Sequence, residues 1–272
     1  MLFVSGEKPE RFPKALAAGA DLVCIDLEDA VHPDFKHAAR QQVLDFARAH
    51  RGAPLAVRLN QLRGPEGLRD LLALAESGAV LDWLLLPKVE HPDDLSLVHA
   101  VAGHAFHQLM PLIETPLGLQ HAPVMAAMAR TDAPKLAGLM LGGADLSVEL
   151  GCAFSWDGLL HARGALVAAA RRTGLQVWDV PHLDLTDLDG LRDETRRVAA
   201  LGFTCKSAIH PTQVAPIHEA FLPPQADVAW AQAMLEAEAA HHTGAFIFQG
   251  KMVDPPVLAK ARRVLRMAGA AS

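Results

Sequence analysis

Short apolar segments alternate with longer helical patterns over most of this 272-residue chain, and this alternation restricts its fold more than any other feature. Several helical patterns end on a glycine just before the next apolar segment, as at Gly19, Gly78, Gly174 and Gly202. Glycine adopts the left-handed conformation that ends a helix at little cost. The candidate strands are Leu2–Val4, Leu22–Asp26, Leu55–Leu59, Trp83–Leu86, Leu109–Ile113, Ala137–Leu141, Gln176–Trp178 and Lys206–Ile209.

About eight repeats of strand, helix and glycine predict a (β/α)8 TIM barrel, a fold of about 250 residues. The hydrophobic content of 51% is enough for one large core. A doubly wound open sheet is the alternative, but no GxGxxG motif follows the first strand to favour it.

The pattern changes near residue 222, so we predict a catalytic barrel over residues 1–222 and a C-terminal helical extension over residues 223–272. Asp227–Ala240 and Val257–Ala268 have helical patterns, and the apolar segment Ala245–Gly250 between them reads as a turn. Because the barrel is complete before this extension, its apolar residues are expected to pack on a neighbouring subunit.

Composition excludes several classes of protein. A net charge of -6 and a pI near 6.1 argue against a nucleic-acid partner. No apolar run reaches the roughly 20 residues that span a bilayer, and the first residues do not resemble a signal peptide. Three scattered cysteines predict no disulfide framework, so we expect a cytoplasmic protein.

Acidic residues follow the predicted strands at the end where barrel enzymes place their active sites. Glu114 ends the fifth strand, and Asp145 follows the Gly142-Gly143-Ala144 turn after the sixth. Such a pair of carboxylates predicts a magnesium site, because Mg²⁺ is usually held by one or two carboxylates, waters and substrate oxygens. Zinc is disfavoured, since none of the 14 histidines forms an HxxxH or HxH cluster.

Arg58, near the end of the third strand, is a planar donor suited to a substrate carboxylate. It is also expected to pair with Glu28 or Asp29, which follow the second strand. No GxSxG motif indicates a serine hydrolase. Lys88 and Lys206 lie on strands, so a class I aldolase with a Schiff-base lysine is a competing interpretation.

The order of these motifs resembles the citrate lyase beta-subunit-like family, relatives of malyl-CoA and citramalyl-CoA lyases. The matching residues span nearly the whole chain: Leu2–Gly6, Pro9–Phe12, Lys14, Ala15, Gly19–Asp21, Asp26–Val31, Val57–Asn60, Leu86–Val89, Ile113–Thr115, Gly142, Asp145, Leu146, Lys206, Ile209–Pro211 and Gln213. The chain departs from the family pattern at two positions: Ser5 stands where the family has a proline, and Cys205 where it has a glycine. Both departures bear on which acyl carrier is bound, and neither touches a proposed metal ligand.

The resemblance implies a TIM barrel that assembles as a homotrimer or homohexamer, with Mg²⁺ on Glu114 and Asp145 and the 2-oxo acid beside Gly143, Ala144 and Asp145. It implies that Arg58 contacts the oxo acid or the thioester oxygen and that Glu28 and Asp29 order metal-bound waters. Arg11 and Lys14 would lie near the coenzyme A phosphates or pantetheine arm. Gly250–Pro255 resembles the family's lid, which makes Asp254 an acid/base candidate in a neighbour's site.

The reaction implied is a magnesium-dependent, reversible Claisen-type cleavage. A 3-hydroxyacyl thioester of citryl-, citramalyl- or malyl-CoA type would give oxaloacetate, pyruvate or glyoxylate and an acyl thioester. One alternative is a citrate lyase beta subunit that cleaves a citryl thioester of acyl-carrier protein within a complex. Another is a catalytically silent barrel that binds a metabolite, and a third is an unrelated metal-dependent aldolase that acts without a thioester.

Overall fold

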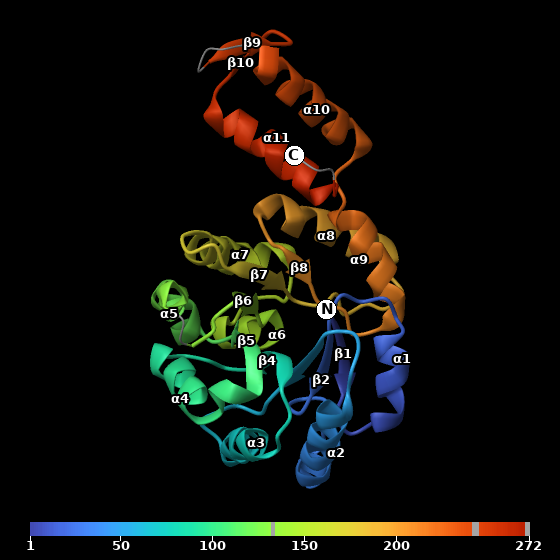
Figure 1. Cartoon of the computed structure of the whole chain (residues 1–272), viewed down its shortest axis with the longest axis vertical. Helices are drawn as coiled ribbons and strands as arrows, with labels where there is room; N and C mark the ends of the chain where they lie inside the picture. The colour runs from blue at the N-terminus through green and yellow to red at the C-terminus, as the bar shows by residue number, and fades with distance from the viewer. Residues whose placement is uncertain (132–133, 241–244, 270–272) are drawn as a thin grey trace. The chain divides into compact units, whose positions relative to one another are not determined.

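The computed structural model describes residues 1–131, 134–240 and 245–269, and it divides into two compact units, Met1–Pro216 and Ile217–Ser272. Each unit is described by itself (Figure 1). None of the helices in the described residues is long and apolar enough to cross a membrane.

The first unit is a parallel barrel in which each strand pairs with the next along the chain. Hydrogen bonds from the Phe3 N–H to the Ala208 carbonyl (2.9 Å) and from the Ala208 N–H to the Met1 carbonyl (2.8 Å) join the last strand to the first. The predicted (β/α)8 fold is thus confirmed. Within the described residues the barrel strands are β1 Leu2–Ser5, β2 Val23–Asp26, β3 Leu55–Arg58, β4 Leu81–Leu86, β5 Phe106–Ile113, β6 Gly138–Leu141, β7 Gln176–Asp179 and β8 Cys205–Lys206.

Helices lie outside the ring of strands (Figure 1). The α-helices of the described part of this unit, the last of which runs past its boundary, are α1 Phe12–Leu16, α2 Lys36–Ala49, α3 Pro65–Glu76, α4 Pro92–Ala102, α5 Pro116–Ala127, α6 Gly143–Leu150, α7 Trp156–Arg171, α8 Leu188–Leu201 and α9 Val214–Phe221. Single 3-10 turns are η1 Pro9–Arg11, η2 Pro33–Phe35, η3 Gly103–Ala105, η4 Met128–Arg130 and η5 Pro211–Gln213. Helix α6 was not predicted from the sequence.

Large side chains fill the barrel interior, so this is a packed core rather than a channel. Trp83 of β4 and Trp178 of β7 meet across it, with ring centroids 4.7 Å apart. They belong to one buried cluster with Met110, Leu112 and Cys24. Burial raises the pKa of the Cys24 thiol, which behaves here as a small apolar side chain.

The second unit pairs helices α10 (Gln225–Ala240) and α11 (Pro255–Met267) with a two-stranded antiparallel sheet, β9 (Phe246–Phe248) and β10 (Lys251–Val253). The predicted turn over Ala245–Gly250 therefore includes a strand of a hairpin. Phe246, Val253 and Leu258 are buried in the core of this unit. The predicted division near residue 222 and the packing of the extension on another subunit remain predictions.

Candidate active site

Arg58 is fixed at the end of β3 by the acids of the neighbouring strand. Its Nε lies 2.7 Å from Asp26 Oδ1 and its Nη2 lies 2.7 Å from Asp26 Oδ2, while Nη1 is 2.9 Å from Glu28 Oε2. The strand register places Asp26 beside Arg58. Glu28 and Asp29 were the predicted partners of Arg58, but Asp26, its bidentate partner, was not predicted. Asp29 is 3.8 Å away, and its side chain is largely exposed.

The guanidinium of Arg58 keeps its positive charge. Burial acts to lower the pKa of its guanidinium, but the attraction of Asp26 and Glu28 raises that pKa above its ordinary value. The guanidinium carbon also lies 5.2 Å from the centroid of the Phe3 ring. The positively charged Arg58 guanidinium, which contacts Asp26 and Glu28, is thereby held at the open end of the barrel.

Lys88 connects the acids of three strands, in an unusual backbone conformation. Its φ is 52°, in the left-handed region that a non-glycine residue seldom adopts. In this conformation its backbone N–H donates to Glu114 Oε1 at 2.7 Å. Its Nζ lies 2.8 Å from Glu28 Oε1 and 3.7 Å from Asp145 Oδ2. Strained backbone of this kind tends to occur at functional sites.

Glu114 is a buried carboxyl group at the end of β5, with 2% of its surface exposed. Burial, and then repulsion by Glu28, raise its pKa to about 8. Gly142 packs against this carboxyl group, since a Cβ atom added there would lie 2.1 Å from Glu114 Oε2. A glycine is therefore required at this position for the two strand ends to approach each other.

Asp145 lies in the first turn of α6, and 43% of its side chain is exposed. Its charge contributes to the raised pKa of Glu114, and both acids line the same cavity. In the described residues no three acid, histidine or cysteine side chains form a complete metal cluster. A two-carboxylate site completed by water and substrate is what Mg²⁺ prefers, and an ion bound there would favour the charged form of Glu114.

A cavity of about 360 Å³ opens between these groups. Its charged edge includes Asp29, Arg58, Glu114 and Asp145, and the first two residues of α6, Gly143 and Ala144, are part of its wall. The rest of the wall is mostly apolar side chains, among them Phe3, Leu112, Met140, Phe154, Val180 and Leu183. The cavity therefore combines a charged end with an apolar side.

Of the other predicted residues, Arg11 and Lys14 are not among those that line this cavity. Arg11 ends η1 and Lys14 lies in α1, and both are exposed. Asp254 is in the second unit, where its Oδ1 accepts a hydrogen bond from the Val257 N–H (3.3 Å) at the start of α11. Arg11 and Lys14 belong to the first unit and Asp254 to the second, and each is described within its own unit. Their roles toward thioester and proton transfer remain predictions.

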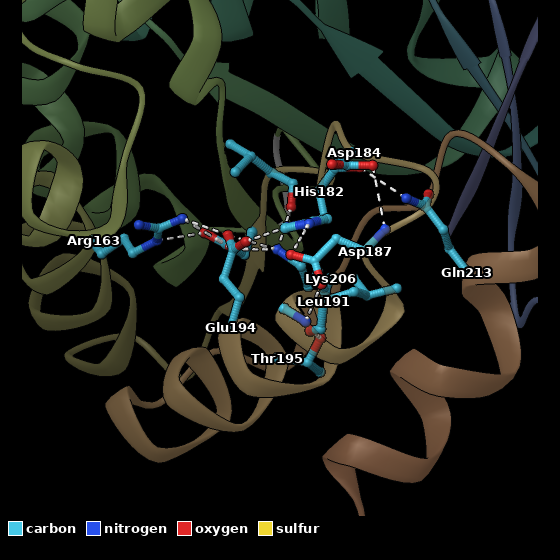
Figure 2. A network of polar contacts seen from close by, with 12 residues as sticks. Arg163, His182, Asp184, Asp187, Leu191, Glu194, Thr195, Lys206 and Gln213 are labelled. Atoms are coloured by element: carbon cyan, nitrogen blue, oxygen red, sulfur yellow. Dashed lines mark hydrogen bonds and ion pairs between the residues drawn. The ribbon is translucent and has the colours of Figure 1, made fainter.

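Lys206 is not free to act as a nucleophile. Its side chain is fully buried, and Nζ lies 2.9 Å from Asp179 Oδ2, 2.8 Å from the Val180 carbonyl and 3.0 Å from Glu194 Oε1. Arg163 joins the same acids, and the network extends to His182 (Figure 2). Lys206 was a predicted candidate for a Schiff-base lysine, but its side chain belongs to this structural network.

Comparison with known proteins gives the relationship directly. The model of the HpcH/HpaI aldolase/citrate lyase family matches residues 1–211. The chain belongs to this family. A citrate lyase subunit beta-like protein of Mycobacterium tuberculosis is 37% identical, with 100% of this chain and 96% of the relative covered. The L-malyl-CoA/beta-methylmalyl-CoA lyase of Cereibacter sphaeroides is 34% identical, with 98% and 93% covered.

A solved structure agrees over nearly the whole chain. The protein CitE of Mycobacterium tuberculosis, in complex with magnesium, acetoacetate and coenzyme A, superimposes with a TM-score of 0.85 at 36% identity. The comparison covers 98% of this chain and 97% of that one. The family resemblance read from the sequence is confirmed, and the predicted magnesium agrees with the ion in this relative.

Proposed function

We propose that this chain is a magnesium-dependent carbon–carbon lyase. It would cleave a 3-hydroxyacyl thioester of citryl-, citramalyl- or malyl-CoA type into a 2-oxo acid and an acyl thioester by reversible Claisen chemistry. One observation carries the proposal: the buried Arg58 guanidinium lines the same cavity as Glu114 and Asp145. The names of the relatives support it, because one is a malyl-CoA lyase and another binds magnesium, acetoacetate and coenzyme A.

Each residue has a chemical task in this proposal. Magnesium, when bound, would polarise the hydroxyl and carboxylate oxygens of the substrate. Glu114 and Asp145 would hold it, and Glu28 and Asp29 would order water around it. Arg58 would donate hydrogen bonds to the oxygen on which negative charge develops as the bond breaks, with little reorganisation because Asp26 already fixes it.

The remaining tasks concern the thioester. Asp254 of a neighbouring subunit would move a proton to or from the α-carbon of the acyl group, in a homotrimer or homohexamer. Arg11 and Lys14, exposed in the first loop region, would contact the coenzyme A phosphates. A carrier-protein thioester is the second candidate, favoured by the likeness to a citrate lyase subunit beta-like protein.

The test is a cleavage assay on malyl-CoA, citramalyl-CoA, citryl-CoA and citryl-loaded carrier protein, with magnesium or with chelator. We expect magnesium-dependent release of a 2-oxo acid from at least one coenzyme A ester. Release from the loaded carrier alone would favour the second candidate. Irreversible inactivation by borohydride in the presence of the 2-oxo acid would instead indicate a Schiff base on Lys88 and contradict the proposal.

A further inference from the structure

The active-site cavity lies next to a second cavity, of about 330 Å³, that the proposed reaction does not use. Trp156 and Arg163 of α7 and Glu194 and Arg197 of α8 line the second cavity. Two side chains line both cavities, Phe154 and Leu183. We call this pair the partition.

Phe154 lies beside the start of α6, the helix that carries Asp145. A Cβ atom added to Gly143 would lie 3.2 Å from Phe154 Cε2 and 2.8 Å from Val180 Cγ1, so the ring rests close to the Gly143 backbone. The next residue, Ser155, caps the N-terminus of α7, and its Oγ accepts a hydrogen bond from the Gly158 N–H at 3.2 Å. The ring is thus attached to a defined helix start, next to the charged end of the cavity.

Leu183 lies on a loop whose backbone carbonyls accept two side-chain hydrogen bonds. Lys206 Nζ donates to the Val180 carbonyl at 2.8 Å, and Gln213 Nε2 donates to the His182 carbonyl at 2.8 Å. The His182 ring adds a contact of 2.8 Å to Glu194. The Leu183 side chain itself is 54% exposed, so packing in the core does not determine its identity.

We propose that Phe154 and Leu183 are specificity-determining residues that limit the size of the substituent on the carbon bearing the hydroxyl group. The proposal rests on the proposed function, in which magnesium on Glu114 and Asp145 would hold the carboxylate of that carbon. The substituent of this carbon, which becomes the side chain of the 2-oxo acid, then faces the apolar side of the cavity. A short apolar side chain fits in front of the partition, and a longer one would have to enter the second cavity.

The test compares straight-chain 2-oxo acids in the condensation direction with acetyl-CoA and magnesium. The measured quantity is the ratio of kcat/KM for 2-oxopentanoate to kcat/KM for pyruvate. We expect Leu183→Ala and Phe154→Leu each to raise this ratio by about tenfold or more, because one methylene in an apolar pocket changes selectivity by roughly 10–200-fold. Leu185→Ala is the matched control, since Leu185 is 44% exposed on the same loop and lines neither cavity.

Binding of the same two acids, measured by calorimetry with magnesium present, gives the ratio of their Kd values without turnover. An unchanged ratio in both partition variants, or an equal rise in Leu185→Ala, would overturn the partition. Absence of turnover by the wild-type chain with every 2-oxo acid would count against the proposed function, while the ratio of Kd values would still decide the partition. Failure of the wild-type chain to bind either acid would overturn both.

Discussion

Glu114 makes proton exchange part of metal binding. Its pKa of about 8 in the metal-free chain means that the carboxyl group is mostly protonated at pH 7, because burial disfavours its charged form. A divalent cation favours the charged form. We therefore expect release of about one proton per Mg²⁺ bound at pH 7, measured by calorimetry in buffers of different ionisation enthalpy. Binding without proton release would contradict this assignment.

The same pKa sets the direction of a stability change in the metal-free chain. Between about pH 4.5, the ordinary pKa of a glutamate, and pH 8, folded Glu114 keeps a proton that the unfolded chain releases. The free energy of unfolding should therefore fall as pH rises through this window, and saturating Mg²⁺ should remove the decline. Glu114→Gln is the control: it keeps an acceptor for the Lys88 N–H and should lose this part of the pH dependence.

Lys88 competes with the metal for the same acids. Its Nζ lies 2.8 Å from Glu28 and 3.7 Å from Asp145, so its charge opposes a cation bound beside them. We expect Lys88→Met to lower the Kd for Mg²⁺ about tenfold, since removal of a charge at this range is worth more than 1 kcal/mol near a protein surface. Calorimetric titration with Mg²⁺ measures the change.

Lys135→Met is the matched control for this prediction. Lys135 also has a left-handed backbone, with φ 64°, but its Nζ donates to the Gly103 and Phe106 carbonyls, each at 2.7 Å. Its replacement should leave the Kd for Mg²⁺ unchanged. A higher Kd in Lys88→Met would show that Lys88 supports the metal site instead of competing with it.

At the scale of elements, the network around Lys206 ties β7, β8 and α8 together. Lys206→Met would leave Asp179, which is fully buried, and Glu194 with one cation fewer. Removal of one partner from a buried ion pair costs about 3–5 kcal/mol, so we expect a decrease of that size in the free energy of unfolding by urea. Arg48→Met, which removes an exposed pair with Asp45, should cost less than about 1 kcal/mol. Equal losses would contradict a structural role for Lys206.

The elements also show how far a sequence can be read. The barrel strands were predictable because each is a short apolar run between helical patterns, as with Leu55–Arg58. Helix α6 was missed because the Gly142-Gly143-Ala144 segment resembles a turn, although Gly143 begins the helix. Asp26 was missed as the partner of Arg58 because only the register of β2 against β3 places them side by side. The contacts of Arg163 with Asp179 and Glu194 depend on how α7 is rotated about its axis, which the sequence pattern does not specify.

At the scale of the whole molecule, the barrel unit contains the proposed metal ligands and Arg58, whereas Asp254 belongs to the second unit. Sequence periodicity predicted the helices α10 and α11, but it could not place Asp254 against a barrel, because that depends on contacts between units and subunits. The family resemblance supplied that expectation, which leads to a direct experiment.

If Asp254 acts in a neighbour's site, two inactive variants should complement each other. Asp254→Asn should preserve the start of α11, because the asparagine side chain can also accept a hydrogen bond from the Val257 N–H. The same substitution removes the acid/base group. Arg58→Lys removes the bidentate donor from the barrel. Each variant alone should lose at least about 100-fold in kcat. Mixed after subunit exchange, they should regain part of the activity, since some assemblies then contain an intact barrel facing an intact Asp254. Continued inactivity of the mixture, with exchange verified by mass spectrometry, would place Asp254 in the site of its own chain or outside the reaction.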